Sequence, residues 1–127
     1  MDELPEFAVS EPVNLDRIEA VTGGDKVLAK AIVDVFIEDT GKRLGLIAKA
    51  IKEGDAATLK LESHSIKGAS SNVGATQMAA LAYTLEQLGG RNALPEAVEP
   101  LEALCAEFAR VRNTLLCHVG DESPPQA

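Results

Sequence analysis

Apolar residues recur along the chain at the three- and four-residue steps that are typical of amphipathic helices. A short helix is predicted from Asn14, whose side chain can cap it, through Val21. A longer helix capped by Asp25 follows. Its predicted apolar stripe comprises Leu28, Ile32, Phe36, Leu44, Ile47 and Ile51. Gly41 and Gly45 lie within this helix, so we expect a neighbouring helix to approach closely there or the helix to bend.

Two further helices are predicted after residue 54. Asp55 can cap the first of them. Its apolar residues recur every seven positions, at Leu59, Ile66 and Val73. The apolar stripe of the next helix comprises Met78, Leu81, Leu85 and Leu88. The pair Gly89–Gly90 is expected to end that helix, because glycine readily adopts the conformation that follows a helix.

The last predicted helix carries an apolar stripe of Val98, Leu101, Cys105, Phe108, Val111 and Leu115. Pro95 suits its first turn, where no backbone amide is needed, and Pro100 either kinks the helix or marks its start. No stretch has the sustained alternation of a β-strand. The pattern therefore predicts an all-α fold, an antiparallel up-and-down four-helix bundle with a short extra helix at its amino end.

The composition agrees with a single helical domain. Apolar residues make up 46% of the 127 residues and aromatic residues only 3%, so Leu, Ile, Val and Ala must build the core. We expect the domain to span residues 14–119, with flexible tails at 1–13 and 120–127, where the chain shows no sustained period. The apolar stripes can be used up inside one chain, which favours a monomer.

The net charge of −8 argues against nucleic acid and anionic membrane surfaces as partners, because both need a basic face. The acidic amino terminus lacks a secretory signal and no stretch is typical of a membrane span, so we expect a cytoplasmic protein. In that compartment Cys105 and Cys117 are expected to be free, buried thiols. Together with His118 they would still lack a fourth zinc ligand, so no metal site is expected.

The candidate chemistry centres on His64, because the chain has no phosphate-binding loop, dinucleotide motif, zinc-protease motif or C-x-x-C pair. Lys60, Lys67 and Gly68 lie three or four positions away and share its helix face, which is expected to turn outward. Neutral imidazole is a nucleophile near pH 7, and flanking lysines can offset the charge of a phosphoryl group. Gly68 leaves room for another molecule. These residues favour a phosphoryl acceptor over the alternative of a core histidine.

Residues 64–75, HSIKGASSNVGA, closely resemble the H-x-[LI]-K-G-[SA]-[SA]-x-x-[LV]-G-A signature of histidine phosphotransfer (HPt) domains. Met78, Leu81 and Leu85-Glu86 continue the resemblance, which covers roughly residues 14 to 117. It implies a four-helix bundle in which Nε2 of His64 carries the phosphoryl group.

The resemblance also implies a relay. The phospho-aspartate of one receiver domain would give its phosphoryl group to His64, which would pass it to the aspartate of a second receiver. The expected partners are response-regulator receiver domains or a hybrid histidine kinase. The chain would be a phosphocarrier rather than an enzyme, without ATP or any cofactor of its own. Mg²⁺ would be supplied by the receiver and offset the charge that builds during transfer.

The other candidate site residues surround His64. Lys67 and Lys60 are expected to hold the phosphoryl oxygens. Three small or polar residues are expected to admit and dock the receiver: Gly68, Ser71 and Asn72. The resemblance implies that Glu86 or Gln87 orients the imidazole through its other ring nitrogen, and Glu86 is slightly preferred.

Two alternatives to the relay remain open. Chemotaxis-type histidine kinases carry an amino-terminal HPt-like domain with a similar motif, and such a domain would be phosphorylated by the kinase's ATP domain. A helical adaptor, by contrast, would bind partners without ever being phosphorylated. In an adaptor, His64→Gln would leave signalling intact.

Overall fold

A computed structural model describes residues 11–120, and the helices in that range confirm the predicted all-α fold. They are α2 (Leu15–Thr22), α3 (Lys26–Glu53), α4 (Ala56–Asn72), α5 (Thr76–Gly90), the 3-10 helix η1 (Leu94–Ala97) and α6 (Val98–His118). No strand occurs among these described residues, and none of their helices is long and apolar enough to cross a bilayer. Most of both predicted tails, residues 1–10 and 121–127, lies outside the described range.

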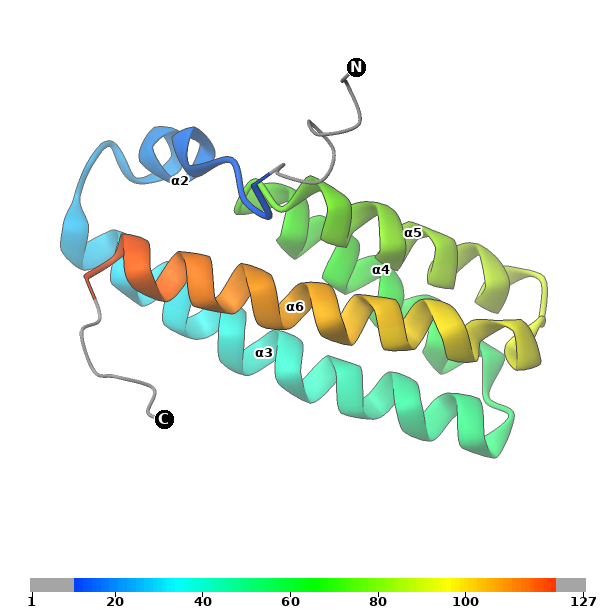
Figure 1. The fold of residues 1–127 in the computed structure, drawn as a ribbon. Helices are drawn as coiled ribbons and strands as arrows, with labels where there is room; N and C mark the ends of the chain where they lie inside the picture. Colours follow the sequence, from blue (N-terminus) through cyan, green and yellow to red (C-terminus); the bar gives the residue numbers. More distant parts are fainter. Residues whose placement is uncertain (1–10, 121–127) are drawn as a thin grey trace, which may run out of the picture.

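The four long helices α3, α4, α5 and α6 form an up-and-down bundle in which each runs opposite to the one before it (Figure 1). The short helix α2 crosses one end of the bundle, near the turn between α4 and α5 (Figure 1). There the amide of Asn14 donates to the carbonyl of Gly74 at 2.8 Å. Val13, which the sequence places in the amino-terminal tail, is buried in the core. The packed part of the chain therefore includes at least one residue that the predicted boundary leaves out.

Polar side chains cap the helices α2, α3 and α4 at the predicted positions. Asn14, Asp25 and Asp55 each accept a hydrogen bond of 3.0 Å from a backbone amide two or three residues further on. Each bond satisfies an amide that has no carbonyl partner inside its own helix. These caps explain why the beginnings of α2, α3 and α4 could be placed from the sequence.

The buried face of α3 coincides with the predicted apolar stripe only in part. Leu28 is 43% exposed, whereas its neighbours Ala29 and Val33 are buried. The carboxyl-terminal half of the stripe agrees better, because Leu44 and Ile47 are buried as predicted. Helix α3 packs against both α4 and α6, so its buried face points between them and includes small residues that hydropathy gives little weight.

The predicted stripe of α6 is confirmed in its carboxyl-terminal half, where Phe108, Val111 and Leu115 are buried, and differs in its amino-terminal half. Leu104 is fully buried, whereas Val98 and Cys105 are exposed. Cys105 and Cys117 are free thiols, as predicted, but both are exposed, so the prediction of buried thiols is wrong. A stripe that uses Leu104 in place of Cys105 keeps the helical period and turns both cysteines toward solvent.

Pro95 and Pro100 lie on either side of the residue at which α6 begins. Helix α6 begins at Val98, so Pro100 belongs to its first turn and marks its start. Pro95 lies in the preceding 3-10 helix η1 and not in the first turn of α6, which corrects its predicted position.

Two glycines allow elements of the bundle to approach one another closely. Gly74 has a φ of 79°, and a Cβ there would lie 2.5 Å from the carbonyl oxygen of Asn14. Helix α5 ends at Gly90, as predicted, and both glycines of the pair belong to its last turn. A Cβ on Gly89 would lie 2.8 Å from the backbone nitrogen of Lys60. Gly89 therefore lets α5 pack directly against the backbone of α4.

Gly41 and Gly45 have different surroundings. Both are exposed on α3, and a Cβ at either position would meet no atom within 4 Å. The close approach of a neighbouring helix expected at these positions is therefore wrong.

We predict that Gly89→Ala lowers the free energy of unfolding by about 1 to 3 kcal/mol, because the new methyl group must push α4 and α5 apart. Gly45→Ala is the matched control, since its methyl group meets no neighbour. It should raise stability by about 1 kcal/mol through helix propensity alone. Urea denaturation of both variants measures the two effects, and a Gly89→Ala protein as stable as the wild type would contradict the close packing.

Candidate functional site

His64 lies in the middle of α4 with its side chain directed to solvent. The side chain is 64% exposed, while the neighbouring residues Ser63 and Ile66 are fully buried. The helical period turns His64 away from the core, as its spacing predicted. The alternative of a histidine buried in the core is therefore excluded.

Glu86 contacts the imidazole from α5. Its Oε2 lies 2.9 Å from Nδ1 of His64, and its side chain is only 13% exposed. An ionised carboxylate can only accept a hydrogen bond, so Nδ1 is the donor and carries the proton. In the neutral ring, Nε2 then has no proton and bears the nucleophilic lone pair. The contact thus selects which ring nitrogen can react.

Lys67 contacts the other oxygen of the same carboxylate. Its Nζ lies 2.8 Å from Oε1 of Glu86 and 5.1 Å from the centre of the Tyr83 ring. The Lys67 ammonium, and after it the His64 ring, hold the pKa of Glu86 below its usual range, although partial burial acts in the opposite direction. Glu86 is therefore ionised at neutral pH and bridges the lysine and the histidine.

Close packing of α4 and α5 brings these residues together. His64 and Glu86 are 22 positions apart in the sequence and lie on antiparallel helices. One turn away from this pair, Gly89 packs against the backbone of Lys60. Because Gly89 has no side chain, the two helices are close enough for Glu86 to reach the ring.

The remaining residues predicted near the imidazole are exposed. Lys60 and Gly68 lie on α4 on the same side as His64, and a Cβ on Gly68 would meet no atom within 4 Å. The surface beside the imidazole is therefore open to an approaching molecule. Gln87 is also exposed, and the contact with Nδ1 comes from Glu86.

Ser71 and Asn72, the predicted docking residues, are exposed near the end of α4. The carbonyl and Oδ1 of Asn72 accept hydrogen bonds from the Arg17 guanidinium at 3.3 and 3.4 Å, which ties α2 to α4. Asn72 also lines an apolar groove of about 340 Å³ between α3 and α4, together with Val35 and Ala69. Of these two predicted docking residues, Asn72 therefore borders an apolar surface on the same helix as His64.

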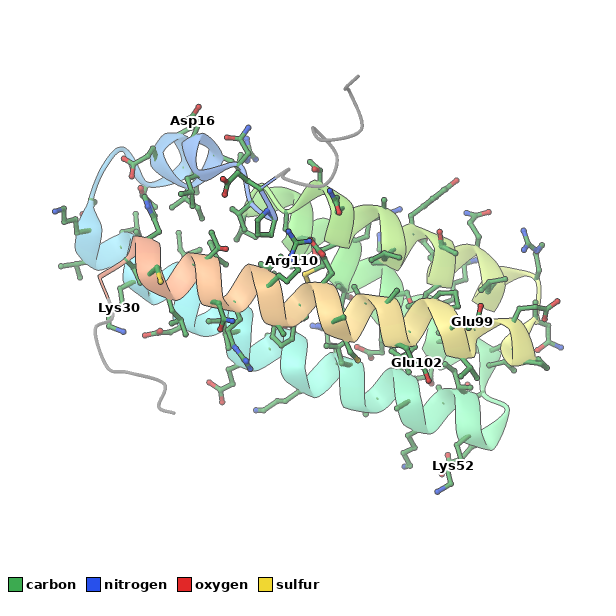
Figure 2. All side chains as sticks on the ribbon, in the orientation of Figure 1. Asp16, Lys30, Lys52, Glu99, Glu102 and Arg110 are labelled. Atoms are coloured by element: carbon green, nitrogen blue, oxygen red, sulfur yellow. The ribbon has the colours of Figure 1, made fainter. Side chains whose placement is uncertain are left out.

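Charged residues are distributed unevenly around the bundle. Arg43 on α3 is paired with Asp39 and Glu62 at 2.8 and 2.7 Å, whereas Lys52 projects into solvent from the end of the same helix (Figure 2). Glu99 and Glu102 lie on α6 (Figure 2), which packs against α3 and α5 and is diagonal to α4. Glu99 and Glu102 are thus placed away from the exposed face of α4.

His118, the second histidine, lies at the end of α6. Its Nε2 is 3.1 Å from Oε2 of Glu19, so it joins the last helix to α2. Within residues 11–120, no three His, Cys, Asp or Glu side chains are grouped so that they could hold a metal ion.

Tyr83 was not singled out from the sequence. It lies one turn before Glu86 on α5, and its ring faces the Lys67 ammonium. The three-residue spacing between Tyr83 and Glu86 was the available signal, because residues at this spacing share a helix face.

The lowered pKa of Glu86 predicts an acid-sensitive contribution to stability. Since the folded-state pKa lies below the unfolded value, the contacts of the carboxylate stabilise the fold at neutral pH, and this contribution is lost as the pH falls through the folded-state pKa. Glu86→Gln should lower the free energy of unfolding by about 1 kcal/mol at neutral pH and by progressively less in acid. Urea titrations of both proteins at several pH values test this, and a difference that does not change with pH would contradict it.

Comparisons with known proteins agree with this geometry. The model of the family described as Hpt domain matches residues 31–114. Among solved structures, histidine-containing phosphotransfer protein B (HptB) from Pseudomonas aeruginosa PAO1 superimposes with a TM-score of 0.81 at 28% sequence identity. The match covers 87% of this chain and 96% of the HptB chain. No curated protein sequence matches the chain significantly. The family match spans more than half of the chain, and the chain therefore belongs to the Hpt (histidine phosphotransfer) domain family.

Proposed function

We propose that the chain relays a phosphoryl group between the aspartates of response-regulator receiver domains through phospho-His64. The observation that carries this proposal is the exposed imidazole whose Nδ1 donates to the ionised Glu86, at 2.9 Å. This bond leaves the Nε2 lone pair available for attack on phosphorus.

In the proposed transfer, Nε2 of His64 forms a bond to phosphorus while the bond between phosphorus and the receiver's aspartate oxygen breaks. The aspartate leaves as a carboxylate, and the proton on Nδ1 stays in its hydrogen bond with Glu86. As the new bond forms, the ring becomes positive, and the negative charge of Glu86 stabilises it. Transfer to a second receiver reverses these steps. Mg²⁺ belongs to the receiver's acidic pocket, and the chain contributes no cofactor of its own.

Lysines on both sides of His64 support the same role. Lys60 and Lys67 lie four residues before and three residues after the histidine, so their ammonium groups can reach the oxygens of a phosphoryl group on Nε2. The negative charge of these oxygens is offset without a metal site on the chain. The chain acts as a carrier, because it ends each relay as it began and takes no phosphoryl group from ATP by itself.

A receiver is proposed to dock on the open face of α4. Gly68 leaves the approach to His64 free, and Ser71 and Asn72 extend the same exposed surface toward the apolar groove between α3 and α4. An apolar centre with a polar border is typical of protein interfaces. We propose that a receiver domain is the partner that binds this face. We also propose that the chain is a monomer and acts in the cytoplasm.

We predict that His64→Gln abolishes acid-labile labelling by phosphorylated receiver domains in the presence of Mg²⁺, because glutamine has no nucleophilic ring nitrogen. His118→Gln removes the other histidine and is the matched control, which should be labelled like the wild type. Equal labelling of His64→Gln and the wild type would refute the phosphoacceptor role. Labelling of the wild type by a kinase's ATP domain and by no receiver would favour the chemotaxis-kinase alternative, and labelling by neither donor would favour the adaptor.

We further predict that Gly68→Leu lowers the rate of transfer from a receiver by at least about tenfold, the effect of losing 1.4 kcal/mol of docking energy. The new side chain stands in the open space beside the imidazole and blocks the partner. Phosphorylation by a small donor such as phosphoramidate should be affected much less, since it needs little room. Equal losses with both donors would indicate damage to His64 itself and would contradict the docking role of this face.

A further inference from the structure

The Lys67 ammonium is engaged by two residues of α5 in the unphosphorylated protein. Its Nζ lies 2.8 Å from Oε1 of Glu86 and 5.1 Å from the centre of the Tyr83 ring. The Lys67 side chain is only 30% exposed in this position. A cation over an aromatic ring is attracted to the ring's negative face, so Tyr83 and Glu86 hold Lys67 together.

In this resting position Lys67 is bonded to the carboxylate that also accepts from Nδ1 of His64. Glu86 is bonded to Nδ1 of His64, whereas the phosphoryl group is carried by Nε2. The two ring nitrogens point in divergent directions, so the carboxylate at Nδ1 and the phosphoryl oxygens on Nε2 would compete for the same ammonium. We expect contact with the phosphoryl oxygens to draw Lys67 away from Glu86.

A phosphoryl group provides a strong reason for that movement. It presents roughly two negative charges and three acceptor oxygens, compared with the single charge of Glu86. The lysine side chain is flexible, and the neighbouring Gly68 leaves the adjacent space open. Glu86 keeps the hydrogen bond from Nδ1 of His64, so its carboxylate retains a partner when the ammonium leaves.

We propose that Lys67 exchanges partners when His64 is phosphorylated, leaving Glu86 and the Tyr83 ring for the phosphoryl oxygens. Tyr83 is then a positioning residue, which stabilises Lys67 in the unphosphorylated site and opposes its departure. The inference rests on the proposed function of His64. Through this exchange Lys67 has stabilising contacts in both the unphosphorylated and the phosphorylated state. Because neither state is strongly favoured by the lysine, the transfer stays reversible.

The test follows the Lys67 side chain by NMR in the full chain before and after phosphorylation with phosphoramidate. In this reaction Nε2 forms the bond to phosphorus, the phosphorus–nitrogen bond of phosphoramidate breaks, and ammonia leaves with the proton it needs from water. The Lys67 Cε is bonded to the ammonium nitrogen that faces the Tyr83 ring, so its protons should resonate upfield of those of the other lysines. Lys67→Arg identifies their signal, and mass spectrometry measures the added phosphoryl group.

Two variants of Tyr83 calibrate the signal. Tyr83→Leu removes the aromatic ring and gives the Lys67 shift without ring current, whereas Tyr83→Phe keeps the ring face and should behave like the wild type. Tyr83 is the chain's only tyrosine and there is no tryptophan, so tyrosine fluorescence gives a second reading of the same position.

The proposal predicts that phosphorylation moves the Lys67 signal of the wild type and of Tyr83→Phe toward the value of Tyr83→Leu. A phosphorylated protein whose Lys67 signal does not move would overturn the exchange of partners while leaving the function of His64 intact. Absence of the added mass in the wild type would instead contradict the phosphoacceptor role, and the inference would be refuted with it.

Tyr83→Leu should also shift the phosphorylation equilibrium toward phospho-His64 by about two- to fivefold, which is the effect of losing one exposed cation–π contact. Phosphorylated and unphosphorylated forms are compared for the wild type and both Tyr83 variants against the same phosphorylated receiver. An equilibrium that Tyr83→Phe shifts as much as Tyr83→Leu would contradict a role for the ring face.

Discussion

The backbone contact between α4 and α5 determines the geometry of the site. Gly89 lies against Lys60 so closely that a Cβ would be 2.8 Å from the lysine backbone nitrogen. One turn away, the same approach brings Glu86 to 2.9 Å from Nδ1 of His64. A glutamate side chain is short compared with the usual separation of packed helices, which is 8–10 Å between axes. At a wider helix spacing the carboxylate of Glu86 would not reach the ring of His64.

The site combines an exposed nucleophile with a shielded charge. His64 is in solvent, where a large partner can reach it, whereas Glu86 is largely covered by its neighbours. A shielded carboxylate is costly unless its charge is shared, and here it is shared by the Lys67 ammonium and the donor on the imidazole. The same contacts that keep Glu86 ionised therefore also hold the proton on Nδ1. The stability of this part of the fold and the reactivity of His64 therefore both depend on the carboxylate of Glu86.

Local signals explain what was predictable about the fold and where prediction failed. The caps at Asn14, Asp25 and Asp55 form bonds within three residues, so the beginnings of their helices could be placed without knowledge of the bundle. The exposure of Cys105 could not be predicted from such local signals. Cys105 and Leu104 are adjacent apolar positions, and which of them is buried depends on the direction from which the other helices pack against α6.

The sequence by itself determined the helical class, the caps and the exposed His64 with Lys67 and Gly68 at helical spacing, because these features depend on residues within one or two turns. It left Glu86 and Gln87 nearly equivalent as partners of the imidazole and did not indicate Tyr83. Only the tertiary structure selected Glu86 and placed Tyr83 beside Lys67. The register of α5 against α4 is set by a contact between residues 29 positions apart, Lys60 and Gly89. That register arises from close packing between helices, and the sequence of either helix alone does not contain it.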